Sequence, residues 1–196
     1  MPILPAEPDL HPPDLWERGG HGNPAERWWC LHTKPRQEKA VARVLRSRDI
    51  AHYLPLVLNV DRTPKGRTIR SIGPLFTGYL FLLGDEHQRL EALRTDRLAN
   101  VLEVGDQDAL INDLRQIHQM LSSGLAVVPE PVMPVGARVR INSGPLKGIV
   151  GTVIRRDKRD RFVATVHFLG RGAMVDLQDW QVERIDGDAS TMTRGA

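Results

Sequence analysis

The sequence of 196 residues contains a single cysteine, two tyrosines and four phenylalanines. One cysteine excludes an internal disulfide framework. No apolar run approaches the roughly 18 residues that a membrane-spanning helix requires. The first residues also lack a basic segment followed by a long apolar core, the pattern typical of a signal peptide. We therefore expect a cytoplasmic protein that does not enter the membrane.

Catalytic motifs are also missing from the sequence. It has neither a glycine-rich dinucleotide loop nor a phosphate-loop lysine, and its histidines are scattered without metal-ligand spacing. Cys30 and His32 lie two residues apart and share one face of a predicted strand, which could pair a thiol with an imidazole. A lone cysteine on an apolar strand is more often a small core residue. We predict a protein with no enzymatic activity, no cofactor and no bound metal.

Positive charge is concentrated in one part of the chain. Residues 27–72 contain 11 Lys or Arg against 3 Asp or Glu, whereas the whole chain carries a net charge of only +3. Such a block favours a nucleic acid or another polyanion as partner, although a solvated surface would have the same composition.

The hydrophobic pattern divides the chain into two folded units. Residues 1–26 are rich in Pro, Gly and acidic side chains and have no apolar period, which predicts a disordered N-terminal arm. Over residues 27–124 the predicted order is strand, helix, three strands, helix, strand and helix. That order indicates an α+β domain with an antiparallel sheet.

A second pattern follows a proline-rich linker at residues 125–135. Residues 136–186 contain five short runs rich in Val and Ile, separated by Gly and charged turns. Several short strands at close spacing predict a small all-β barrel. Residues 187–196 are small and polar, which predicts a flexible tail.

The scarce aromatic residues gather in the stretch GPLFTGYLFLLGD. In an extended strand Tyr79, Phe81 and Leu83 point to one face, and Leu80 and Leu82 point to the other. Both faces are apolar. One face can lie on the core of the domain, and the other then requires a second layer or a binding partner.

A predicted helix after Pro35 is strongly amphipathic. Arg36, Lys39, Arg43 and Arg46 fall on one side of a helical wheel, opposite an apolar side. A basic stripe of this kind is typical of a solvated helix face, and it is equally suited to contact phosphates.

Several stretches resemble the bacterial NusG family of transcription elongation factors. They are WWCLHTKPRQEKAV, GPLFTGYLFLL and LRT in the first unit, and VGARVRINSGPLKGIVGTV with FLGRGAMVDL in the second. The two units match the NGN domain and the SH3-like KOW domain of that family, in the same order. HTKPRQE is most similar to the specialised RfaH-like and UpxY-like paralogs. Thr77 stands where those paralogs usually have proline, and residues 1–26 lie outside the shared domains.

The resemblance implies a factor that suppresses pausing or termination. The NGN domain would bind the clamp helices of bacterial RNA polymerase, with the candidate contact residues Tyr53, Phe76, Tyr79, Leu80 and Phe81. Its basic side would face non-template DNA in the transcription bubble, with the candidate residues His32, Thr33, Lys34, Arg36, Lys39 and Arg43. The KOW domain would recruit a small-subunit ribosomal protein or Rho through Phe168, Leu169 and Arg171. We expect a monomer.

Other interpretations stay open at this point. Phe76, Tyr79 and Phe81 could all be core residues. Tyr79 is then the one best suited to a partly exposed position, because its hydroxyl group tolerates contact with water. If Phe168 fills the barrel, strand alternation leaves Leu169 exposed. The alternative functions are a housekeeping NusG-type factor that assists Rho termination, and a KOW-based RNA-binding protein associated with the ribosome.

Overall fold

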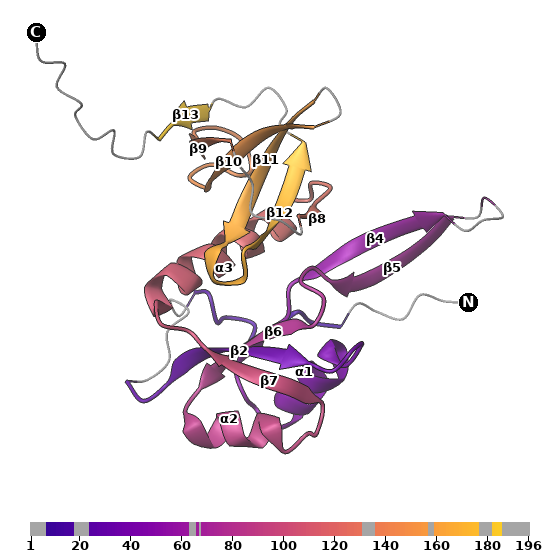
Figure 1. Ribbon diagram of the computed structural model, residues 1–196, viewed down its shortest axis with the longest axis vertical. Coiled ribbons are helices and arrows are strands. Elements are labelled where there is room, and N and C mark those ends of the chain that lie inside the picture. The colour runs from indigo at the N-terminus through magenta and orange to yellow at the C-terminus, as the bar shows by residue number, and fades with distance from the viewer. Residues whose placement is uncertain are drawn as a thin grey trace, which may run out of the picture.

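The structure is a computed structural model that describes residues 7–17, 24–62, 66, 68–130, 136–156, 159–176 and 182–185 (Figure 1). The predicted tail at residues 187–196 lies outside these residues. No helix in the described part of the chain has the length and apolar character needed to cross a membrane.

The first domain follows the predicted order of elements and adds two short strands. In chain order it contains β1 (Leu10–His11), β2 (Arg27–Thr33), α1 (Glu38–Ser47), β3 (His52–Tyr53), β4 (Leu56–Arg62), β5 (Thr68–Pro74), β6 (Tyr79–Gly84), α2 (Glu86–Leu93), β7 (Leu98–Glu103) and α3 (Gln107–Ser122). The α+β prediction is confirmed. All pairings within the sheet β1-β3-β6-β2-β7 are antiparallel.

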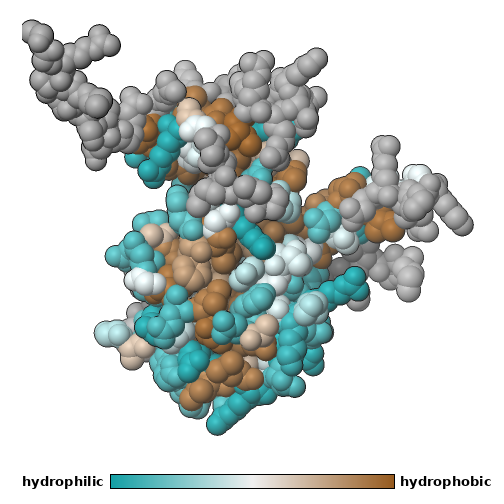
Figure 2. All heavy atoms as spheres, in the orientation of Figure 1, coloured by the Kyte–Doolittle hydropathy of each residue, from teal (hydrophilic) through white to brown (hydrophobic). Residues whose placement is uncertain are grey.

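Strands β4 and β5 form a separate two-stranded ribbon that projects from the domain (Figure 1). Leu58 and Val60 on β4 and Ile69 on β5 are exposed. Figure 2 shows brown surface on this projection. The ribbon thus exposes apolar side chains outside the main sheet, beside the exposed polar residues Thr68, Arg70 and Ser71 of β5.

Both faces of the central sheet are covered by other parts of the same chain. On one face Trp29, Leu31, Leu80 and Leu82 pack with buried residues of α1 and α2. On the other face the sheet packs with α3 and with the N-terminal segment. The sheet residues on this face are Trp28 and Cys30 of β2, Tyr53 of β3, and Phe81 and Leu83 of β6. The second apolar face predicted for β6 therefore has a second layer.

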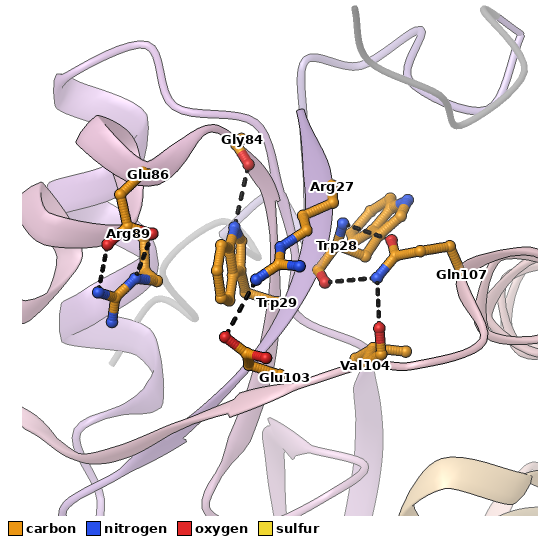
Figure 3. A network of polar contacts seen from close by, with 9 residues as sticks. All are labelled: Arg27, Trp28, Trp29, Gly84, Glu86, Arg89, Glu103, Val104 and Gln107. Atoms are coloured by element: carbon orange, nitrogen blue, oxygen red, sulfur yellow. Dashed lines mark hydrogen bonds and ion pairs between the residues drawn. The ribbon is translucent and has the colours of Figure 1, made fainter. Parts of the chain in front are cut away.

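Two clusters hold β2 between these layers (Figure 3). Gln107, the first residue of α3, accepts a hydrogen bond from the Trp28 backbone N–H at 2.7 Å and donates to the Trp28 carbonyl at 3.1 Å. The guanidinium of Arg27 stacks 4.0 Å from the centroid of the Trp29 ring, and that of Arg89 lies 5.3 Å away. The Trp29 indole N–H donates to the Gly84 carbonyl at 3.0 Å. These contacts fix β2 to α3 on one side and to β6 on the other.

The second unit is the predicted all-β barrel. Its elements are β8 (Val128–Glu130), β9 (Ala137–Ile141), β10 (Val150–Arg156), β11 (Arg159–Val166), the 3₁₀ turn η1 (His167–Leu169), β12 (Arg171–Asp176) and β13 (Val182–Arg184). The sheet order is β13-β9-β10-β11-β12-β8. Figure 1 places α3 between this sheet and the first domain.

Two boundary predictions are corrected. Residues 128–130 fall in the predicted linker, but they pair with β12 as part of the barrel sheet. Residues 7–17 fall in the predicted disordered arm, but β1 pairs with β3. Leu10 and Leu15 are buried because they reach the aromatic side of the sheet, which local sequence does not reveal. The division into 27–124 and 136–186 stays a prediction.

Candidate functional site

Four rings gather on the α3 side of the sheet. The Trp16 ring stacks on Trp28 with ring centroids 5.7 Å apart, and it meets the Tyr53 ring edge-on at 5.4 Å. His118 of α3 lies edge-on to Tyr53 at 5.7 Å. We call Trp16, Trp28, Tyr53 and His118 the aromatic layer. Its rings come from four segments that are distant in the sequence.

Four of the five predicted polymerase-contact residues are core residues in this arrangement. Tyr53, Phe76, Leu80 and Phe81 have at most 2% of their surface exposed. Phe76 and Phe81 meet edge-on, with ring centroids 6.4 Å apart. Leu80 points to the opposite face, toward α1 and α2, because side chains alternate along β6. Tyr79, the fifth residue, is half-buried.

Tyr79 lies where three predicted groups of residues meet. Its ring stacks on His32, its register partner in β2, with centroids 4.9 Å apart and planes 18° apart. The guanidinium of Arg171, from the barrel, lies 5.2 Å from the centroid of the Tyr79 ring. Arg171 also donates to the Thr77 carbonyl at 3.4 Å. The structure thus brings together one residue from each of the predicted polymerase, nucleic-acid and barrel-partner sites.

Glu38 positions the turn before Tyr79, a role that the sequence reasoning missed. Its carboxylate accepts a hydrogen bond from the Gly78 backbone N–H at 2.7 Å. Gly78 has φ +86°, a conformation that favours glycine, and Glu38 is buried. The sequence does contain a signal for this role. Glu38 precedes Val41 by three residues and Leu45 by seven, a spacing that puts all three on the same face of the helix. A carboxylate on the apolar face of a helix requires a buried partner.

The predicted nucleic-acid residues differ widely in exposure. Lys34, Arg36 and Arg43 are exposed, whereas Thr33 is buried; His32 and Lys39 are half-buried. Lys39 donates to the Ile72 carbonyl at 2.6 Å, so its ammonium group already holds the base of the ribbon. Lys34 pairs with Asp96 at 2.9 Å. Lys34, Arg36 and Arg43 are therefore the exposed cations of this group, although Lys34 and Arg43 each also pair with a carboxylate.

Burial shifts the pKa values of three titratable side chains beneath this surface, those of Cys30, His52 and Tyr53. Burial raises the pKa of the Cys30 thiol to about 12, which keeps it protonated and removes it as a candidate nucleophile. Burial also raises the pKa of Tyr53 and lowers the pKa of the His52 imidazole to about 4. Within the described ranges, no group of three or more His, Cys, Asp or Glu side chains could hold a metal ion.

Comparison with known protein families gives a match over the first domain and part of the segment that follows. The family described as "Transcription termination factor nusG" matches residues 26–133. The chain belongs to the NusG family. The N-terminal segment at residues 7–17 precedes the NusG match, and β9–β13 follow it.

Individual relatives extend the similarity over both units. The chain is 27% identical to the transcription termination/antitermination protein NusG of Vibrio vulnificus (strain CMCP6) and 25% identical to that of Vibrio cholerae. Each alignment covers 83% of this chain and 98% of the relative. A solved structure described as "Domain interaction in Thermotoga maritima NusG" is similar at 19% identity and a TM-score of 0.44, and covers 82% of this chain and 98% of that one.

In this NusG-family chain, the expected exposure of Leu169 in the barrel is corrected by the structure. Residues 167–169 form the turn η1 rather than a strand, so strand alternation does not apply to Phe168 and Leu169. Phe168 is 40% exposed, whereas Leu169 is half-buried and packs against the core. Phe168 is therefore the exposed apolar residue of this turn.

A polar contact ties the same turn to α3. The buried Asp113 carboxylate of α3 accepts a hydrogen bond from the His167 backbone N–H at 2.9 Å and lies 3.0 Å from Nδ1 of its imidazole. The Gln116 side chain accepts from the Val150 N–H at 2.6 Å. These bonds, together with Arg171, hold the barrel against α3 and the Tyr79 turn.

Proposed function

We propose that this NusG-family chain is a transcription elongation and antitermination factor of the specialised RfaH-like type. It binds the clamp helices of RNA polymerase through its first domain, contacts non-template DNA, and recruits a ribosomal protein or Rho through its barrel. Membership of the NusG family and relatives named as termination/antitermination proteins support this proposal.

The position of Tyr79 is the observation on which the docking surface rests. Tyr79 and Phe81 lie on the same face of β6, so Tyr79 is the half-exposed end of a row that continues into the buried core. An aromatic ring supported from below by fixed neighbours loses little side-chain entropy when a partner covers it. Because Arg171 lies over Tyr79, docking there requires the barrel contact to open.

Replacing Tyr79 tests this surface. We expect Tyr79→Ala in the full chain to weaken polymerase binding at least about tenfold, because truncated aromatic hot spots commonly cost 2 kcal/mol or more. Leu93→Ala is the matched control, since Leu93 is exposed on α2 at the opposite side of the sheet. Binding would be measured by fluorescence anisotropy with purified polymerase. Unchanged affinity in a folded Tyr79→Ala variant would place the surface elsewhere.

The exposed cations Lys34, Arg36 and Arg43 are the proposed DNA contacts. Replacing each with Ala should reduce affinity for a polymerase–bubble complex and flatten its salt dependence by about 0.7 in log–log slope per lost phosphate contact. Arg94→Ala is the control, since Arg94 is exposed at the C-cap of α2, where it pairs with Glu91. A loss of affinity with an unchanged slope would argue against phosphate contacts.

Transcription assays distinguish the proposed role from its alternatives. On a template with a Rho-dependent terminator, the wild-type chain should increase read-through and shorten pauses. Increased termination would instead indicate a housekeeping NusG-type factor that assists Rho. Capture of ribosomal RNA in place of polymerase subunits from an extract would indicate an RNA-binding protein built on the barrel.

The turn η1 supplies a test of barrel recruitment. Phe168→Ala should weaken binding of the barrel partner while leaving the melting temperature within a few degrees, because Phe168 is exposed. Leu169→Asp should lower the free energy of unfolding by at least about 2 kcal/mol, since it places a charge against the core. Thermal melts and binding to a small-subunit ribosomal protein or Rho would be measured. A stable Leu169→Asp variant with lost binding would restore Leu169 as the contact residue.

A further inference from the structure

The N-terminal segment at residues 7–17 extends the sheet by one edge strand. Leu10 pairs with Tyr53 and His11 pairs with His52 in an antiparallel ladder. The Leu54 backbone N–H donates to the Asp9 carbonyl at 2.7 Å. This segment precedes the NusG match, which begins at residue 26.

The segment covers part of the proposed docking face, namely Tyr53, which is the register partner of Phe81 and so lies on the same sheet face as Tyr79. Leu10 lies on the same sheet face as its register partner Tyr53, and Trp16 stacks on Trp28 while meeting Tyr53 edge-on. Leu10 and Leu15 are buried against the same cluster. Tyr53, a predicted polymerase contact, is therefore covered by Leu10 and Trp16 of the segment, in addition to its edge-on contact with His118 of α3.

The same segment also reaches the basic side of the domain. Glu7 pairs with Arg43 at 3.5 Å, and the Pro8 carbonyl accepts a hydrogen bond from Arg46 at 2.6 Å. Arg43 is one of the proposed DNA contacts. One segment thus touches a residue of each proposed surface, with an acidic side chain on the basic side and an indole on the aromatic side.

Several features favour release of the segment. Its ladder is two residues long, and its contact through Glu7 is an exposed ion pair that contributes little stability. Among the described residues, neither the buried Trp16 indole N–H nor the Tyr53 hydroxyl has a hydrogen-bond partner. Buried polar groups without partners weaken the contact that encloses them.

We propose that residues 7–17 are a displaceable cover of the docking face. In the free chain they occupy Tyr53, Trp28 and Arg43, and they leave when a helical surface of RNA polymerase binds there. The inference rests on the proposed function. The apparent affinity for polymerase is proportional to the fraction of chains in which the segment has left the docking face. The cover therefore lowers the apparent affinity.

A reversible cross-link between the two strands tests this cover. His11 and His52 are register partners, and their side chains point away from the face that carries Leu10 and Tyr53. Directly opposed residues of an antiparallel pair lie within the Cα separation of a disulfide, about 4.4–6.8 Å. The full chain with His11→Cys and His52→Cys therefore allows the cover to be locked without altering the docking face. Cys30 is buried and does not compete.

We expect the oxidised double variant to bind polymerase at least about tenfold more weakly than the same protein after reduction. Each single cysteine variant, oxidised and reduced, is the control. Trp16→Ala without any cross-link should bind more tightly than the wild-type chain. Equal affinity before and after reduction would overturn the cover while leaving the proposed function intact. If neither the reduced variant nor the wild-type chain binds polymerase, the proposed function fails and the inference fails with it.

Discussion

Phe81→Ala is expected to lower the free energy of unfolding of the first domain by about 3–5 kcal/mol, the usual loss when a buried phenylalanine is truncated. Phe81 is fully buried, meets Phe76 edge-on, and lies opposite Cys30 and Tyr53 in the neighbouring strands. Urea unfolding followed by tryptophan fluorescence would measure the loss. Any reduction in polymerase binding should then be proportional to the unfolded fraction.

Phe81→Leu is the control for this prediction. It keeps an apolar side chain of similar reach, so the destabilisation should be smaller than in the alanine variant. Its polymerase affinity should equal that of the wild-type chain. If Phe81→Ala remained as stable as the wild-type chain but lost polymerase binding, Phe81 would be a direct contact and the core assignment would be wrong.

Gly151→Val is expected to unfold the barrel while the first domain stays folded. A Cβ atom at Gly151 would lie 2.3 Å from the Val163 carbonyl oxygen and 2.5 Å from Cζ of Phe162. Neither can move easily, because Val163 is paired with Thr152 across the β10–β11 ladder and Phe162 is buried. We expect a destabilisation of on the order of 3 kcal/mol or more.

Amide NMR spectra of the full chain would measure this effect, since signals of β9–β12 should lose dispersion while those of β2 and β6 keep it. Gly105→Ala is the matched control, because a Cβ there meets no atom within 4 Å. The Gly151→Val chain should still bind polymerase through its first domain. Preserved barrel signals would show that the two strands separate more readily than their contacts indicate.

Much of the fold was predictable because it depends on local periodicity. Alternating apolar side chains gave β2 and β6, and the helical period gave α1 with its buried residues Val41 and Leu45. Runs rich in Val and Ile, separated by turns, gave the barrel strands. The two apolar faces of β6 also predicted that something must cover the second face.

Less of the candidate site was predictable, because its contacts join residues far apart in the chain. The sequence placed Tyr79 and Arg171 in separate sites, whereas the structure places one over the other. Residues 167–169 look like the end of a strand, but their 3₁₀ turn exposes Phe168 in place of Leu169. The roles of the named site residues stay predictions.

The sequence by itself determined the order of the longer strands and helices, the apolar character of both sheet faces and the concentration of basic residues, since each depends on neighbours along the chain. Tertiary structure alone decided what covers the second face. Trp16, Tyr53 and His118 carry no period that links them, and they meet because β1 pairs with β3 while α3 crosses the same side. Glu38 likewise gains its partner at Gly78 only after β6 and α1 are placed together. Contacts of this kind are set by packing between distant segments, which local periodicity does not encode.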